Sequence, residues 1–307
     1  MIRSILVPLD GSPFGEHALP TAAALARRAG ATLHLAHVHQ ASVPLTPAGI
    51  VIHDSFDLDQ LRGEQSYLAD VAGRVTAGAP LPVEKALLEG DVVLGLKTYA
   101  ERHSIDLVVM STHARGAFAR FWLGSIADDL AHEIPQPILL VPPADAPTAP
   151  EQEPTLRSIV VPLDGSALAE KILGPAEKLC RLFGAELHLI RVNRPVALPG
   201  QTLGRSGSLE QLLEEMACEA ERELDEARTY LAQIAAGLIA KGVKVHTRAV
   251  IGREPVSSIL TEAKGDRADL IAMQTHGRRG LARLFMGSVA DGIVKGGVPV
   301  LLHHTAG

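Results

Sequence analysis

The sequence predicts two tandem α/β domains, each built on a doubly wound parallel sheet. One observation is an internal repeat, because Ser4–Ser12 reads SILVPLDGS and Ser158–Ser166 reads SIVVPLDGS. The other is the pattern within each copy, where short and almost wholly apolar runs alternate with helical segments. Such runs are typical of parallel strands that are covered by helices on both faces of the sheet.

The repeat extends through both halves of the chain. Thr32–Val38 returns as Glu186–Val192, and Thr112–Asp128 returns as Thr275–Asp291. We therefore expect a first domain at residues 1–143 and a second at residues 156–307. The proline-rich stretch between them, residues 144–155, has no apolar periodicity and is expected to be an extended linker.

The elements of the first copy can be placed from apolar runs and turn residues. Strands are expected at Ile5–Leu9, Leu33–Val38, Glu84–Leu88, Leu107–Met110 and Ile138–Val141. Helices are expected at Ala18–Ala29 (ended by Gly30), Leu58–Val75, Val92–Arg102 and from about Ile126. The second copy repeats this order with a longer central helix, Leu209–Ala240, which Ser208 and Gln211 would start as a capping box.

Composition limits the classes of partner. The chain has 307 residues, a formal net charge of −6 and 47% apolar residues, with only 3% aromatics. This is a globular composition with aliphatic cores. The acidic balance argues against nucleic acid as a partner, although a few backbone amides and arginines can still hold a small anion.

The cysteines and the apolar runs indicate the compartment. Cys180 and Cys218 are the only cysteines and lie outside any CxxC spacing, which favours reduced thiols over a disulfide or a zinc site. No apolar run approaches the length of a membrane span, and the first apolar run is too short for a signal peptide. We therefore expect a cytoplasmic protein without a membrane partner.

Chemically distinctive residues gather at the ends of the expected strands. Asp10 follows the first strand, Val38 ends the second and Met110 ends the fourth. Ligands of open parallel sheets bind beyond the carboxyl ends of the strands, so these residues are candidates for one site. The alternative for Asp10 and Asp164 is a turn-forming role, because Asp-Gly is a common turn dipeptide.

The loop after the fourth strand of the second copy resembles an anion-binding loop. Gly277 is followed after nine residues by Gly287 and Ser288, and Ser288 is expected to open a helix whose N-terminal amides favour an anion. Three arginines in the loop add positive charge: Arg278, Arg279 and Arg283. The alternative is that Ser288 is an ordinary N-cap, with Asp291 in the first helical turn.

The histidines predict no metal site. His113 and His276 recur after threonine in both copies, but neither has a second histidine or a carboxylate at ligand spacing. We expect them to structure the loop or contact a ligand. The strand histidines are expected to be packed or hydrogen-bonded: His34, His37, His39 and His188.

Gly90–Thr98 nearly spells a phosphate-binding P-loop. Leu96 separates the second glycine from Lys97, whereas in a P-loop the lysine follows that glycine directly. We therefore expect this segment to be an ordinary helix start.

Together these residues resemble the universal stress protein family, whose loop signature is Gly-x-x-Gly, nine residues, then Gly-Ser/Thr. The resemblance covers both halves and implies an adenine-nucleotide α-hydrolase-like fold that binds ATP or ADP, with Mg²⁺ possible beside the phosphates. In the first copy it implies a site made of Pro8, Asp10, Val38, Met110, Gly124, Ser125 and Ile126. In the second copy the matching residues are Pro162, Asp164, Val192, Met273, Gly277, Gly287, Ser288 and Val289.

The resemblance also implies which part of the nucleotide each of these residues contacts. The Asp and Pro at the end of the first strand and the Val at the end of the second meet the adenine. The Met lines the nucleoside, and the glycine loop with its Gly-Ser pair holds the phosphates.

The two copies depart from the family signature to different degrees. The first glycine of the signature is Ser111 in one copy and Gln274 in the other, whereas the second glycine is Ala114 in the first copy and Gly277 in the second. A methyl group at Ala114 would obstruct a close approach of phosphate to the backbone. We therefore rank the second site above the first for ATP or ADP.

The resemblance also implies an internal pair of domains. The last strand of the family pairs across a dimer interface, and Pro137–Val141 and Pro299–Leu302 are its counterparts here. The tandem chain can form that pair within itself, and two chains can associate further as a homodimer.

Three functions remain open on the sequence. The first is a nucleotide-dependent regulatory protein of the stress response, and the second is an interaction or scaffold protein with vestigial pockets. The third is a slow ATPase. We expect no catalytic residues and no enzyme, because no nucleophile and base recur together with the pockets.

Overall fold

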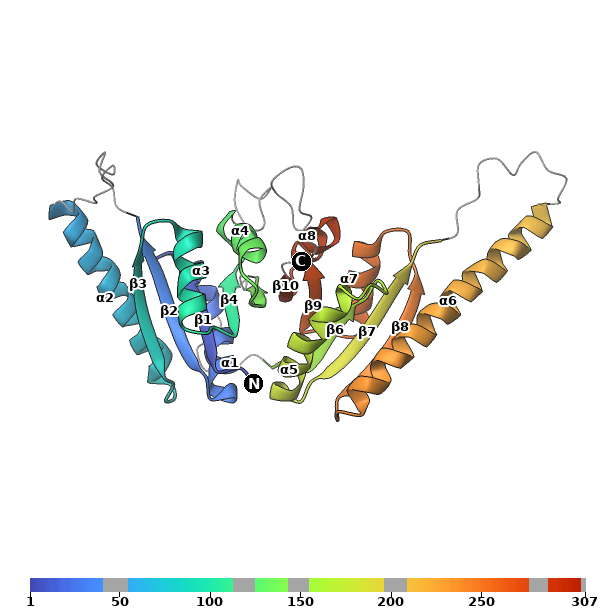
Figure 1. Cartoon of the computed structure of the whole chain (residues 1–307), viewed down its shortest axis with the longest axis horizontal. Coiled ribbons are helices and arrows are strands. Elements are labelled where there is room, and N and C mark those ends of the chain that lie inside the picture. The colour runs from blue at the N-terminus through green and yellow to red at the C-terminus, as the bar shows by residue number, and fades with distance from the viewer. Residues whose placement is uncertain (41–54, 113–124, 143–154, 196–208, 276–286, 305–307) are drawn as a thin grey trace. The chain divides into compact units, whose positions relative to one another are not determined.

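The computed structural model describes residues 1–40, 55–112, 125–142, 155–195, 209–275 and 287–304 (Figure 1). The chain divides into two compact units, which are described separately below. Unit 1 comprises Met1–Thr155 together with Thr275–Gly307, and unit 2 comprises Leu156–Gln274. Most of the expected linker at residues 144–155 lies outside the described residues.

Unit 1 alternates strands and helices in the expected order. Its strands are β1 (Ser4–Leu9), β2 (Thr32–His39), β3 (Val83–Glu89), β4 (Leu107–Ser111), β5 (Ile138–Val141) and β10 (Val300–His304). Its helices are η1 (Gly15–Ala18), α1 (Leu19–Ala29), α2 (Ser55–Ala77), α3 (Val92–Arg102), α4 (Ser125–Glu133) and α8 (Ser288–Val294). The bounds of β1 to β5 agree with the predicted ones to within one residue at each end.

The sheet of unit 1 has the order β3-β2-β1-β4-β5-β10. The strands β1 to β5 pair in parallel, and only β10 runs antiparallel to its neighbour. The chain moves outward from β1 through β2 to β3 and then crosses to β4 and β5 on the other side of β1. The order therefore reverses between β1 and β4, and the carboxyl ends of these two strands flank the place where such sheets bind ligands.

Helices cover the sheet of unit 1 on two sides. The helices α1 and α2 contact each other and β2, whereas α3 contacts α4 as well as β2 and β3 (Figure 1). Right-handed crossovers that step in opposite directions along a sheet place their helices on opposite faces, which accounts for the two groups. The doubly wound parallel fold predicted from the sequence is confirmed.

Local signals end and start these helices as expected. Gly30 closes α1 in the left-handed conformation, with φ of 63°. Asp91 caps α3, because its carboxylate accepts the amide hydrogen of Leu94 at 2.8 Å. The segment that nearly spells a P-loop is therefore a capped helix start, as predicted.

Unit 2 repeats the architecture with the sheet order β9-β6-β7-β8, all parallel. Its strands are β6 (Ser158–Pro162), β7 (Glu186–Asn193), β8 (Lys244–Ile251) and β9 (Leu270–Thr275). Its helices are η2 (Ala169–Ile172), α5 (Leu173–Phe183), α6 (Leu209–Ile239) and α7 (Pro255–Gly265).

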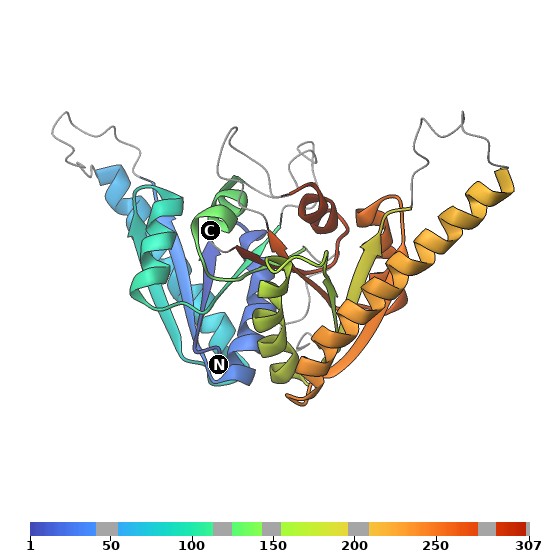
Figure 2. The ribbon, with the colours of Figure 1, turned by 45° about the vertical axis from the view of Figure 1, so that its right-hand side comes forward.

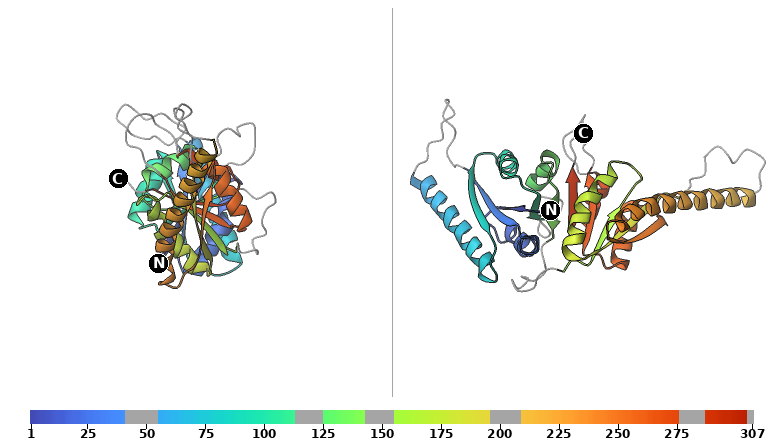
Figure 3. Two further views of the ribbon diagram at one scale, coloured as in Figure 1. Left: turned by 90° about the vertical axis from the view of Figure 1, so that its right-hand side faces the viewer. Right: turned by 60° about the horizontal axis from the view of Figure 1, so that its bottom comes forward.

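The long helix α6 packs with its C-terminal half along β8 and β7 (Figure 2). Its N-terminal turns run beyond these strands, as Figure 3 shows. Ala227 is the first buried residue of α6 among those whose side chains are described. The helix has the predicted extent, whereas Ser208 of the expected capping box lies outside the described residues.

The strand β10 lies beside β5, and Val300 to Leu302 pair antiparallel with Leu140 to Ile138. Both strands are buried and wholly aliphatic over this stretch. The two counterparts of the family's last strand are therefore in contact within one chain.

No helix in the described ranges is both long enough and apolar enough to cross a membrane.

Candidate functional site

The turn after β1 fixes the carboxylate of Asp10 at the carboxyl edge of the sheet. Its Oδ1 accepts the backbone N–H of Ser12 at 2.9 Å and the hydroxyl of Ser12 at 2.7 Å. Gly11 has φ of 79°, a conformation that glycine adopts without steric cost. The turn-forming interpretation of Asp10 is therefore confirmed, and the same turn aims the carboxylate at the cavity described next.

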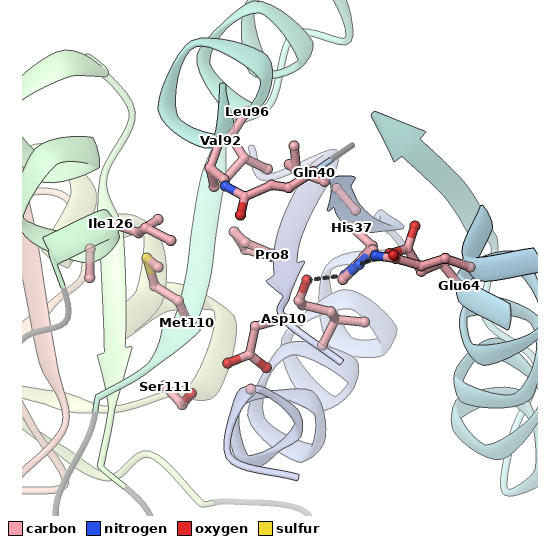
Figure 4. A pocket seen from close by; sticks show the side chains of 16 residues that line it. Pro8, Asp10, His37, Gln40, Glu64, Val92, Leu96, Met110, Ser111 and Ile126 are labelled. Atoms are coloured by element: carbon pink, nitrogen blue, oxygen red, sulfur yellow. Dashed lines mark hydrogen bonds and ion pairs between the residues drawn. The ribbon is translucent and has the colours of Figure 1, made fainter. Parts of the chain in front are cut away.

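A cavity of about 550 Å³ lies at the carboxyl ends of β1, β2 and β4 in unit 1 (Figure 4). Five residues predicted for this site from the sequence line it: Pro8, Asp10, Val38, Met110 and Ile126. The aliphatic side chains of α3, such as Val92 and Leu96, close another side. The volume is in the range of small-molecule sites in proteins.

The remaining predicted residues of the first copy are only partly described. Gly124 lies outside the described residues, as do Ala114 and His113. Ser125 is the first residue of α4, and Ile126 follows it at the cavity wall. The first turn of α4 therefore points the helix N-terminus toward the cavity, where its backbone amides favour an anion.

One wall of the cavity was not predicted from the sequence. Glu64 of α2 lines the cavity together with His37 of β2. The Nδ1 of His37 donates to the carbonyl of Leu9 at 2.8 Å, which turns its Nε2 toward Glu64 Oε1 at 3.5 Å. Gln60, one helical turn before Glu64, donates to the same carboxylate at 2.9 Å. The sequence does not distinguish Gln60 and Glu64 from the other polar residues of α2, so it does not predict that they face a cavity.

Behind this wall, His39 bridges two carboxylates. Its Nδ1 lies 2.8 Å from Glu64 Oε2 and its Nε2 lies 3.0 Å from Asp57 Oδ1. An ionised carboxylate only accepts hydrogen bonds, so this geometry suits the imidazolium form, in which each ring nitrogen carries a proton. Burial opposes the charge, but the hydrogen bonds that His39 donates to Glu64 and Asp57 outweigh it and raise the pKa of His39.

The same contacts keep Glu64 ionised. Burial works against its charge, yet the hydrogen bonds from Gln60 and His39 outweigh burial and lower the pKa of Glu64. The described lining thus holds two carboxylates, Asp10 and Glu64, and contains no lysine or arginine. This part of the cavity suits hydrogen-bond donors such as hydroxyl or amino groups, and not phosphate.

Unit 2 places the matching residues at the matching strand ends. Pro162 ends β6, Val192 lies near the end of β7, and Met273 lies in β9. Asp164 forms the same turn as its counterpart, since its Oδ1 accepts the N–H of Ser166 at 2.8 Å. The predicted turn is therefore confirmed in both copies.

The anion-binding loop of the second copy is described only at its end. Gly277, His276 and the three loop arginines lie outside the described residues. The helix α8 begins at Ser288, followed by Val289, and Gly287 is the N-cap, without a side-chain cap hydrogen bond. The interpretation of Ser288 as the N-cap residue is therefore wrong, because the chain turns into the helix one residue earlier.

Unit 2 has a fixed cation where unit 1 has His37. Arg191 occupies the corresponding position in β7, and its guanidinium lies 5.2 Å from the ring centre of Tyr230. A Cβ added to Gly165, which follows Asp164, would lie only 3.2 Å from that guanidinium. The two copies thus offer opposite charges at the same corner, Glu64 with His37 in one and Arg191 in the other.

Comparisons with known proteins agree with the duplicated architecture. A model of the Universal stress protein family matches residues 1–142 and residues 155–303. Universal stress protein Slr1230 from Synechocystis sp. is 22% identical over an alignment of 321 positions. This alignment covers 98% of this chain and 99% of that protein.

Two further likenesses point the same way. Universal stress protein MJ0531 from Methanocaldococcus jannaschii is 31% identical over 150 residues, covering 48% of this chain and 81% of that protein. The crystal structure of a universal stress protein from Archaeoglobus fulgidus superposes with a TM-score of 0.69 at 20% identity, covering 99% of this chain and 96% of that one. At that identity the structural likeness shows the fold alone.

Proposed function

Because the chain belongs to the universal stress protein family, we propose that it is a regulatory protein of the stress response that binds an adenine nucleotide, and not an enzyme. The observation that carries the proposal is the cavity of unit 1, which brings Pro8, Asp10, Val38 and Met110 together at the switch point of the sheet. These residues come from three strands, and the sequence alone predicts that they form one site.

The lining of the cavity suits the nucleoside part of the ligand. Pro8, Val38 and Met110 offer apolar surface to a planar base. Asp10 and Glu64 accept hydrogen bonds from the adenine amino group and the ribose hydroxyls. The phosphates lie toward the N-terminus of α4, away from Glu64, where a Mg²⁺ ion would offset their charge.

The second copy is proposed to bind as well, and more tightly. Gly277 keeps the glycine that the first copy replaces with Ala114. Arg191 supports the ranking, because a guanidinium beside the Asp164 turn attracts an anionic ligand that Glu64 of unit 1 repels.

The internal repeat supplies a matched pair of variants for the test. In Val38→Trp an indole fills part of the unit 1 cavity, and Val192→Trp makes the same change in unit 2. Calorimetric titration with ATP, ADP and adenosine should show two sites in the wild-type chain and loss of one site in each variant. Chromatography of nucleotides released on denaturation identifies the ligand that copurifies. Binding that survives both substitutions would contradict the proposed sites.

A second candidate function is an interaction protein with vestigial pockets. The acidic lining of the unit 1 cavity favours it, because two carboxylates without a lysine or arginine disfavour a triphosphate. In that case the wild-type chain binds no nucleotide by calorimetry and none copurifies. Steady release of phosphate from ATP that is lost in Asp164→Ala would favour a slow ATPase instead.

We propose an internal pair of domains, which the pairing of β5 with β10 supports. Further association of two chains is tested by light scattering on the eluting protein. A cytoplasmic location is proposed because Cys180 and Cys218 are both free thiols.

A further inference from the structure

A cluster of two histidines and a carboxylate lies at the edge of unit 1 opposite the cavity. His34 is near the start of β2, Glu84 is near the start of β3, and His103 is the C-cap of α3. The cavity lies at the carboxyl ends of the strands, whereas these three residues gather at the amino ends. The cluster therefore belongs to a different part of the fold from the proposed nucleotide site.

The donor atoms of the cluster are within metal-binding reach of one another. Glu84 Oε2 lies 3.4 Å from His34 Nδ1 and 3.8 Å from His103 Nδ1, and the three ligand atoms lie within 4.8 Å of one another. Ligands about 2.0–2.1 Å from a tetrahedral zinc ion are separated by about 3.4 Å. Small side-chain rotations at the two exposed members, Glu84 and His103, close the remaining difference.

No other cation competes for the carboxylate of the cluster. Within the described part of the chain, the ion-pair partners of Glu84 are His34 and His103 alone. Lys85, its neighbour in the strand, points to the other face of the sheet because side chains alternate along β3. A carboxylate with only imidazoles around it is free to take a divalent cation.

Tyr99 holds both imidazoles in place. Its ring stacks on His103 with centroids 4.1 Å apart, and its hydroxyl lies 2.9 Å from His34 Nδ1. The stacking restrains His103 in the way that outer partners orient metal ligands. The hydroxyl is a competitor for the nitrogen of His34, because a metal ion at Nδ1 would replace that hydrogen bond.

Unit 2 repeats the donor set at the same place in the fold, with the donors exchanged between elements. His188 of β7 takes the place of His34, and His246 of β8 is its register partner, as Glu84 is the register partner of His34. Asp266 is the C-cap of α7, where unit 1 has His103, and its Oδ2 lies 3.2 Å from His188 Nδ1. A histidine thus stands where unit 1 has Glu84 and a carboxylate where unit 1 has His103, whereas the donors of unit 2 that lie within 4.8 Å of one another are His188, His246 and Glu186.

The set in unit 2 is weakened by neighbouring cations. Arg248 lies 3.5 Å from Asp266, and Lys244 lies 3.3 Å from Glu186, the other carboxylate near His246. These cations already neutralise the carboxylates that a metal ion would need. The donors in unit 1 have no such competitor among the described residues, and this distinguishes the two copies.

We propose that His34, Glu84 and His103 bind a divalent transition-metal ion such as Zn²⁺, with a water molecule as the fourth ligand. Two imidazoles and one carboxylate with an open fourth position are a donor set that zinc uses in proteins. The ion links β2, β3 and the end of α3, so it stabilises unit 1 at the edge away from the cavity. The site is independent of nucleotide binding.

The test titrates Zn²⁺ into the full chain, free of metal and without a histidine tag, and measures affinity with a competing chromophoric chelator. The variants Glu84→Gln and His103→Ala change exposed side chains and leave the fold intact. We expect one tight site in the wild-type chain and a loss of affinity of more than about 100-fold in each variant, since loss of outer partners alone costs about 10- to 100-fold. Zn²⁺ should raise the melting temperature of the wild-type chain but not that of either variant.

Two controls keep the test specific. Tyr99→Phe retains the ring stack and removes the competing hydroxyl, so its affinity for Zn²⁺ should be unchanged or higher. His246→Ala removes a donor of unit 2 and should leave the tight site in place. The proposal is overturned if the wild-type chain binds no Zn²⁺, if Glu84→Gln and His103→Ala bind it as well as wild type, or if only His246→Ala loses it.

Discussion

Replacing His39 with Asn is expected to destabilise unit 1 strongly, in a way that depends on pH. The substitution removes the cation that joins Glu64 to Asp57 and leaves two carboxylates near each other. Asn193 occupies the corresponding position in unit 2, where its side-chain amide donates to the carbonyl of Glu223 at 3.1 Å. Asn is therefore compatible with this place in the fold, and the loss comes from the missing charge.

The magnitude follows from the burial of the three groups. The side chains of His39 and Asp57 are 1% and 0% exposed, so solvent screens that pair very little, whereas Glu64 is 15% exposed and regains some hydration. Removing one partner of a buried ion pair costs about 3–5 kcal/mol. We expect a loss near the lower end, about 3 kcal/mol, because Glu64 is partly solvated.

The sign of the pH dependence follows from two pKa shifts. The pKa of His39 is raised above its ordinary value of 6.5, so its contribution is fully present below pH 6.5 and is lost as the pH rises through the folded-state value. The pKa of Glu64 is lowered below its ordinary value of 4.5, so its contribution is present above pH 4.5 and is lost as the pH falls. The difference between wild type and variant should therefore be largest between about pH 5 and 6.

Urea unfolding followed by circular dichroism at several pH values measures this difference, and hydrogen exchange of β2 and β3 amides assigns it to unit 1. The double variant His39→Asn/Glu64→Gln removes one of the two neighbouring carboxylate charges and should recover part of the lost stability. A difference below about 1 kcal/mol, or one that stays constant from pH 5 to 9, would refute the bridging imidazolium.

Three further predictions follow from single contacts. Gly15→Ala should weaken nucleotide binding to unit 1, because the new Cβ would lie 2.6 Å from Asp10 Oδ1 and displace that carboxylate. The carboxylate is exposed and can move, so the free energy of unfolding should change by less than about 1 kcal/mol. Calorimetry and urea unfolding check this, and Gly174→Ala, where a Cβ meets nothing within 4 Å, is the control. Arg191→Met should lower the affinity of the second site for ATP but leave its affinity for adenosine nearly unchanged; equal losses for both ligands would contradict a role in attracting phosphate. Leu33→Ala, at a side chain with 0% exposure, should lower the free energy of unfolding of unit 1 by about 2–5 kcal/mol, whereas Leu94→Ala, at a side chain with 63% exposure, should change it by less than about 0.5 kcal/mol.

The sequence was most informative where a strand meets a turn. Asp10, Val38 and Met110 end apolar runs, and parallel strands bring their carboxyl ends to one edge, so the grouping of these residues could be inferred without knowing a single distance. The turn at Gly11 and the helix end at Gly30 could also be predicted from the sequence, because glycine is the residue that most readily adopts positive φ. The same reasoning placed β1 to β5 almost to the residue.

The sequence was least informative where a polar side chain comes from a helix. Glu64 lies on α2, whose polar residues look alike in sequence, and nothing there distinguishes the one that faces His39 from those that face solvent. The cluster of His34, Glu84 and His103 was missed for a related reason. Its members are far apart along the chain, and metal spacing can be read in a sequence only when ligands share one local segment.

The antiparallel pairing of β10 with β5 has a practical consequence for dividing the protein. A fragment that stops at the linker would leave the backbone N–H and C=O groups of Leu139 and Leu140 without a neighbour along an apolar border. Such a fragment has β5 as an unpaired edge strand and would pair with another copy of itself through that strand. The two halves of the gene product are therefore best studied joined, with single substitutions in place of truncation.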